Sequence, residues 1–163
     1  MATIQFKKGD EYLIKISRLA AASKEKVCGK AIYGAADIVA NEIRNQLINV
    51  PTDEKYGTES DMANGPRKIQ KKGLYDSLGI ASMQTDSNGD MNVKIGFDGY
   101  NEVKTKAFPN GQPNQMVARS VERGTSFMKA NAFVKKAVSA SKENALNKIK
   151  STVDEEIKKI MEG

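Results

Sequence analysis

The C-terminal stretch of the chain places the strongest constraint on its fold. From Asn131 onward, apolar residues recur with a helical period for about 30 residues, and lysines occupy the opposite side. The apolar stripe consists of Phe133, Val138, Leu146, Ile149, Val153, Ile157 and Ile160. A helix with such a stripe has to bury it against another element. We therefore expect this terminal helix to cover a sheet.

The sheet itself is predicted from a hairpin signal in the middle of the chain. Residues 78–85 and 91–97 are strand-like and flank a turn that contains Asn88-Gly89, a dipeptide typical of tight hairpins. In the second run, alternate residues are apolar, and they are Met91, Val93, Ile95 and Phe97. This alternation predicts a strand that buries one face only. The turn begins like a calcium loop but lacks the distal glutamate, so we interpret it as a hairpin turn.

Four further elements are predicted from periodicity. A short strand is expected at 3–6, and an amphipathic helix after Asp10 places Tyr12, Ile16 and Leu19 on one face. A longer helix runs from Ser23 to about Asn49 and is ended by Pro51. Residues 116–122 are predicted as another strand, which ends at Gly124. Together these elements predict an α+β fold, with a small, mostly antiparallel sheet packed against a long helix and a C-terminal helix.

We expect one domain over 1–163, because 163 residues suit a single core. Between the predicted long helix and the hairpin, residues 52–72 show no periodicity and contain Gly57, Gly65 and Pro66. This pattern predicts a long mobile loop. Loops of this length tend to be functional or disordered, so a partner contact is most expected here.

The residue inventory excludes several functions. Without any histidine, the chain has no imidazole base for nucleophilic catalysis and no imidazole metal ligand. Its single cysteine, Cys28, cannot form an intramolecular disulfide, and we expect it to be a buried apolar residue. Neither a nucleotide-binding glycine motif nor a membrane-spanning run is found. We therefore predict no enzymatic activity, no cofactor, no metal and no membrane association.

The charge leaves an alternative open. The formal net charge is +6, and the one dense basic cluster, within the predicted loop, consists of Arg67, Lys68, Lys71 and Lys72. No aromatic residue for base stacking lies within it. A loop that contacts solvent or a partner protein is the interpretation that we favour. A basic nucleic-acid-binding module is the alternative.

Three short motifs, in order along the chain, resemble those of a known family. They are the helix end Val50-Pro51, the step Gly73-Leu74-Tyr75-Asp76-Ser77-Leu78, and the segment Val121-Glu122-Arg123-Gly124-Thr125-Ser126 followed by Met128, Ala130 and Phe133. The chain thereby resembles the tail-component family of tailed bacteriophages, the neck proteins that join head to tail or complete the tail. It departs from the family pattern at Asn131-Ala132, where Arg-Pro is common.

The resemblance implies an α+β domain with a mechanical role. Family members form a ring, a hexamer when assembled, between the head connector or stopper and the tail tube. Genomic DNA passes through the ring without sequence-specific binding. The location implied is the virion neck or tail, and the bacterial host cytoplasm during assembly. A subunit that is monomeric in solution agrees with this picture.

A cyclic ring needs a head-to-tail interface made of two different surfaces. We expect the loop at 52–72 and a sheet edge near 121–126 to contribute to this interface. The candidate interface residues are Arg67, Lys68, Lys71, Lys72, Leu74, Val121, Glu122, Gly124 and Thr125.

Overall fold

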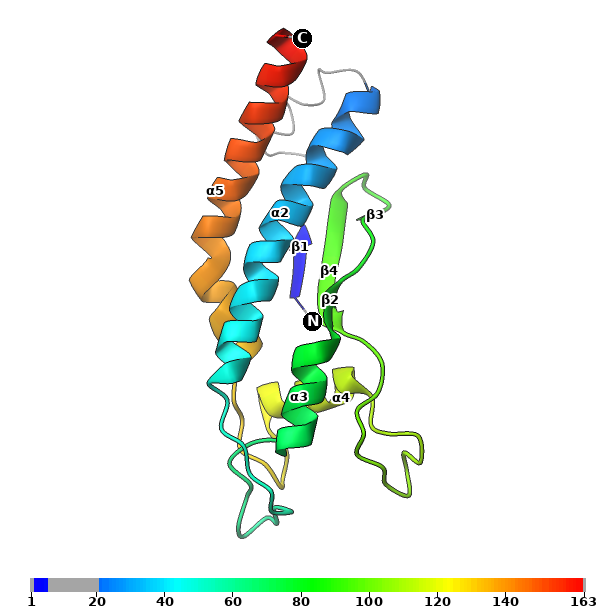
Figure 1. Ribbon diagram of the computed structural model, residues 1–163, viewed down its shortest axis with the longest axis vertical. Helices are drawn as coiled ribbons and strands as arrows, with labels where there is room; N and C mark the ends of the chain where they lie inside the picture. Colours follow the sequence, from blue (N-terminus) through cyan, green and yellow to red (C-terminus); the bar gives the residue numbers. More distant parts are fainter. Residues whose placement is uncertain (1, 6–20, 163) are drawn as a thin grey trace.

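A computed structural model describes residues 2–5 and 21–162, and its elements form an α+β fold as predicted (Figure 1). The helix predicted after Asp10 lies outside the described residues. The strands are β1 (Ala2–Gln5), β2 (Leu78–Ile80), β3 (Gln84–Thr85) and β4 (Met91–Phe97). The helices are α2 (Ala21–Ile48), α3 (Lys68–Ser77), α4 (Asn114–Arg123) and α5 (Phe133–Glu162).

The sheet is antiparallel and centred on β4. Its order is β1-β4-β2, and β3 also pairs with β4, so that Leu78 faces Phe97 and Thr85 faces Met91. The predicted hairpin is therefore confirmed. Its turn has Gly89 at a φ of 79°, a conformation that glycine adopts without strain. The alternate residues of β4 are buried, as the sequence pattern predicted.

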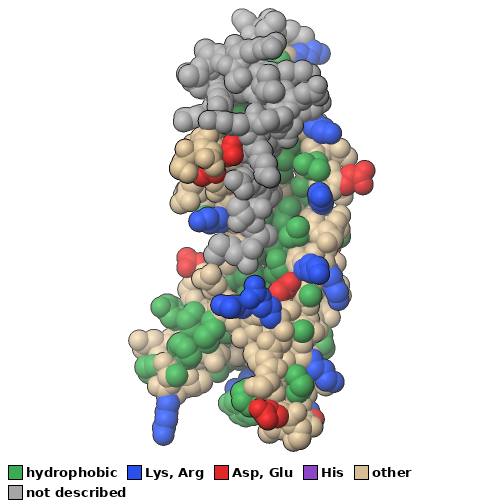
Figure 2. Space-filling model, turned by 180° about the vertical axis from the view of Figure 1, so that it is seen from behind, with side chains coloured by type: hydrophobic (Ala, Val, Ile, Leu, Met, Phe, Trp, Pro, Cys, Tyr) green, Lys and Arg blue, Asp and Glu red, His purple; other side chains and the backbone are tan. Residues whose placement is uncertain are grey.

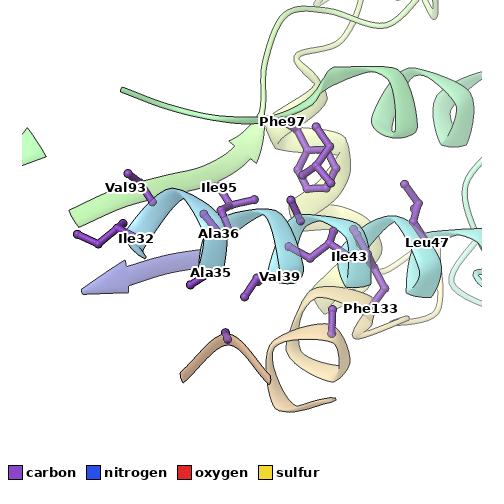
Figure 3. Close-up of a cluster of buried hydrophobic side chains, with 14 of the residues drawn as sticks. Ile32, Ala35, Ala36, Val39, Ile43, Leu47, Val93, Ile95, Phe97 and Phe133 are labelled. Atoms are coloured by element: carbon purple, nitrogen blue, oxygen red, sulfur yellow. The ribbon is translucent and has the colours of Figure 1, made fainter. Parts of the chain in front are cut away.

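The long helix α2 covers the sheet, and α5 packs along α2 (Figure 1). In Figure 3, Ile32 of α2 lies beside Val93 of β4. Ala36 lies one turn further along and is beside Ile95. The expectation that the terminal helix covers the sheet is thus wrong for most of α5. Its first residue, Phe133, does reach the sheet, with its ring edge-on to that of Phe97 at 6.0 Å between centroids.

The buried face of α5 confirms the predicted stripe at Phe133, Ile149 and Val153 but differs from it in the first half of the helix. Val138 and Leu146 are 39% and 45% exposed, whereas the buried face follows a spacing of four through Ala137, Ser141 and Ala145. Small side chains allow two helix backbones to approach closely. Gly34 of α2 fits this arrangement, because a Cβ at that position would lie 3.4 Å from the Lys148 side chain of α5.

The strand predicted at 116–122 is wrong, because these residues belong to helix α4. Its buried residues are Asn114, Val117, Ala118 and Val121, and their spacing is helical. Pro113 precedes the helix, and Gly124 follows it at a φ of 74°. Consequently the predicted sheet edge near 121–126 does not exist.

The loop predicted at 52–72 is also shorter than expected. Helix α3 begins at Lys68, so the connection from α2 spans residues 49–67. The backbone N–H of Arg67 donates to Gln70 Oε1 at 3.0 Å, which satisfies one donor at the helix start. The basic cluster therefore lies at the start of a helix rather than in a loop.

Candidate assembly surface

Three connections meet at the end of the molecule that is opposite the C-terminus, and we call this region the loop end (Figure 1). The connections are residues 49–67, 98–113 and 124–132. The first residues of α3 complete the surface. The loop end thus contains most of the two segments that the sequence assigned to an assembly interface.

Backbone hydrogen bonds join the first connection to the third. The N–H of Ala63 donates to the carbonyl of Phe127 at 2.8 Å, and the N–H of Lys129 donates to the carbonyl of Ala63 at 2.9 Å. The Asn131 side chain adds a bond from Nδ2 to the carbonyl of Asn64 at 3.0 Å. Gly57 also lies close to this junction, where a Cβ would collide with the Phe127 carbonyl oxygen. The structure therefore joins the first predicted interface segment to the residues that directly follow the second.

A carboxylate organises the first connection from within. The Oδ2 of Asp53 accepts the N–H of Asn64 at 3.0 Å, and its Oδ1 accepts the N–H of Lys55 at 3.2 Å. These bonds stabilise the ionised form and lower the pKa of Asp53 below its usual value. The N–H of Asp53 in turn donates to the Pro66 carbonyl, which closes the base of the connection.

Arg67 links this connection to α3. Its guanidinium carbon lies 4.9 Å from the centre of the Tyr56 ring, and Nη1 donates to the Tyr56 hydroxyl at 3.0 Å. Its Nε is 3.6 Å from Oε2 of Glu54. The Tyr56 ring is held in place by these contacts and is nevertheless 80% exposed. Tyrosine and arginine are enriched among the residues that dominate binding at protein interfaces.

Two lysines of the basic cluster have partners within the chain. Lys71 Nζ donates to the carbonyls of Ile48 and Val50, both at 2.7 Å, and so caps the end of α2. Burial lowers the pKa of Lys71. Lys72 forms an ion pair with Asp76 at 2.8 Å, and the hydrogen bond raises the pKa of Lys72. Of the predicted cluster, Lys68 is the residue whose side chain is most available to a partner.

Several predicted interface residues serve the fold instead. Leu74 and Val121 are fully buried, so they belong to the core and not to a contact surface. The carboxylate of Glu122 accepts the N–H groups of Val134 and Lys135 at 2.8 and 3.0 Å, which caps the start of α5. Gly124 is required by its positive φ, and a Cβ added at this position would lie only 2.9 Å from Ala130 N.

The exposed residues of the third connection belong to the surface itself. Thr125 is exposed, and its N–H donates to the Met128 carbonyl at 2.9 Å. Phe127, two residues further along, is 55% exposed, and it faces solvent beside the junction with Ala63.

Sequence reasoning missed the aromatic residues of the loop end. Tyr56, Tyr100 and Phe127 are all exposed, and each lies in a different connection. Tyr56, Phe127 and Val103 line a cleft of about 250 Å³ between the connections. Figure 2 shows apolar side chains gathered on the lobe formed by 98–113, at the lower left of that view. The available signal was the occurrence of bulky aromatic residues in otherwise polar, glycine-containing segments.

The described residues contain no group of three or more cysteine, aspartate or glutamate side chains placed to hold a metal ion. Over the same residues, no helix is both long and apolar enough to cross a membrane.

No protein-family model matches the chain, and no curated protein sequence or solved structure is significantly similar to it.

Proposed function

We propose that the protein is a structural subunit of the neck or tail of a tailed bacteriophage, which joins the head connector to the tail as part of a ring around the genome. The observation that carries the proposal is the loop end. There the segments around Ala63 and Phe127, far apart in sequence, form one bonded surface with exposed aromatic rings. Such a surface suits contact with another protein.

The positions of the family-like motifs support this proposal. Pro51 follows the end of α2, and the step from Gly73 to Leu78 leads from α3 directly into β2. Gly124 ends α4, and Phe133 begins α5. Each motif therefore coincides with the boundary of a helix or strand, where the backbone conformation requires particular residues.

The structure does not favour nucleic-acid binding by the basic cluster. Glu54 and Asp76 offset the charges of Arg67 and Lys72, and the Lys71 ammonium is already bonded to two backbone carbonyls. Binding driven by phosphates weakens steeply with salt. Retention of the purified protein on duplex DNA at low salt and its loss at high salt would support the alternative.

Gene deletion tests the proposed role directly. The gene is removed from the parental phage or prophage, the phage is induced, and the lysate is examined by electron microscopy. We expect separate heads and tails, with joined particles restored when the wild-type gene is supplied on a plasmid. Tails of uncontrolled length would indicate tail termination instead. Intact infectious particles without the gene would refute the proposal.

A further inference from the structure

A groove of about 890 Å³ lies where α4, the start of α5 and the end of β4 meet. Its apolar lining comes from these three elements, from α2 and from the residue before α5, and consists of Val39, Phe97, Ala118, Ala132, Val134 and Val138. The side chain of Val138 is apolar, yet this residue is 39% exposed. The groove therefore leaves apolar surface uncovered.

Three cations surround this apolar surface. Arg119, Arg123 and Lys135 line the groove, and all three are exposed. Glu122 is the one carboxylate among the lining residues, and both of its oxygens accept backbone N–H groups at the start of α5. None of the three cations forms an ion pair with a described residue. The groove is thus both apolar and positively charged.

A segment of the same chain has the complementary character. Residues 52–63, which we call the acidic arm, contain four carboxylates and one lysine, a formal charge of −3. Glu59 is exposed and has no ion pair with a described residue, and the side chain of Asp61 is 75% exposed despite its pair with Lys55. The arm also presents the exposed ring of Tyr56. The arm and the groove have no residue in common.

We propose that the groove of one copy receives the acidic arm of a second copy. Glu59 of the arm meets Arg119 and Arg123, and the Tyr56 ring covers the apolar floor. This inference rests on the proposed ring, whose head-to-tail contacts require two different and complementary surfaces. Tyrosine and arginine are enriched at such interfaces, and opposite charges orient the two partners as they meet.

Photocrosslinking tests the contact in purified protein. The photoreactive residue p-benzoylphenylalanine replaces Tyr56, and this protein is mixed with ¹⁵N-labelled wild-type protein and irradiated. We expect crosslinks between labelled and unlabelled copies, from position 56 to peptides within 115–139. The same probe at Tyr75, an exposed position on α3 outside both surfaces, should give a yield about tenfold lower.

Charge reversal identifies the pair. Arg119→Glu in the labelled copy should lower the crosslink yield about tenfold, and Glu59→Arg in the probe copy should restore it. Lys150→Glu makes the same change in net charge at an exposed position of α5 outside the groove, and should leave the yield unchanged. Crosslinks that occur only within one copy, or that reach other segments, would overturn the proposal.

Two further outcomes are distinguishable. One outcome is that the crosslink is absent, that wild-type protein is retained on duplex DNA, and that Arg119→Glu abolishes this retention. In that case the groove binds a polyanion and the proposed pairing is wrong. Crosslinking depends on the purified chain alone, whereas the neck role is tested by particle morphology. If the gene proves dispensable for particle assembly but the purified protein still crosslinks as described, the pairing of the two surfaces stands and the proposed phage role is refuted.

Discussion

Lys71 illustrates how a single side chain closes the end of a helix. Its ammonium group binds the carbonyls of Ile48 and Val50 at the C-terminus of α2. A cation there satisfies carbonyls that have no partner within the helix and interacts favourably with the helix dipole. Lys71→Met should lower the free energy of unfolding by about 1 to 2 kcal/mol, as measured by urea denaturation.

The neighbouring Lys72 provides the control for this variant. Its ion pair with Asp76 is exposed and spans one helical turn. Lys72→Met should therefore lower the free energy of unfolding much less than Lys71→Met does. Equal losses for the two variants would contradict a capping role for Lys71.

Glu156 gives the protein a predicted response to acid. Its carboxylate accepts hydrogen bonds from Lys159 and Lys30, each at 2.8 Å, and these bonds lower its pKa to about 2. Because the pKa is lower in the folded state than the value of 4.5 expected without these contacts, the carboxylate stabilises the fold above pH 4.5. This contribution is lost as the pH falls from 4.5 to about 2.

Thermal unfolding across this range tests the prediction. Wild-type protein should melt at a higher temperature than Glu156→Gln at pH 6, and the difference should disappear near pH 2. The matched control is Glu155→Gln, at the adjacent and exposed position. A constant difference between wild type and Glu156→Gln at all pH values would rule out titration as its cause.

At the scale of elements, the close packing of α5 on α2 depends on small side chains. Ala137 is fully buried on the face of α5 that also contains Ser141 and Ala145. Ala137→Leu should destabilise the protein by about 1 to 3 kcal/mol, because the added carbons would force the helices apart. Helical circular dichroism during urea unfolding measures the loss. Ala140→Leu, on the exposed face of the same helix, should have little effect.

The residue patterns of the individual elements explain which of them could be predicted from the sequence. The alternation of apolar and polar residues in β4 fits only a strand with one buried face, so Val93 and Ile95 were correctly predicted to be buried. The short apolar run at 116–122 fits either a strand or a helix, and its helical spacing emerges only with Asn114 and Ala118 included. On α5, the prediction followed large residues such as Val138 and overlooked small ones such as Ala137.

The candidate site could be predicted only in part, for a different physical reason. Glycine and proline marked the connection that contains Tyr56, because backbone conformation there depends on local sequence. The bond between Ala63 and Phe127 joins residues far apart in the chain. No local pattern encodes such a pairing. The burial of Leu74 and Val121 likewise depends on elements packed from elsewhere.

At the scale of the whole molecule, the acidic arm should be separable from the fold. Residues 55–61 lie between Asp53 and Ala63, whose backbone contacts close the connection at both ends. Replacing 55–61 with a glycine-serine linker of equal length that keeps glycine at position 57 should therefore change the melting temperature only slightly. Under the proposed neck role, a phage that carries the variant should yield unjoined heads and tails, as counted by electron microscopy.

The linker variant has two clear contradictory outcomes. Normal numbers of infectious particles would show that the arm is not needed for assembly. Loss of the folded state would show that the arm contributes to the core, contrary to its exposure. Lys150→Glu, on the surface of α5, is the appropriate control and should support normal particle numbers.

The pairing of α2 with α5 also determines when the protein can fold during synthesis. The apolar face of α2 that α5 covers stays open until residues beyond 133 have left the ribosome. At synthesis rates of about 5 to 20 residues per second, the delay after α2 emerges is on the order of 5 to 20 s. During this interval the apolar face of α2 is expected to be exposed, and shielding it would keep the nascent chain from aggregating.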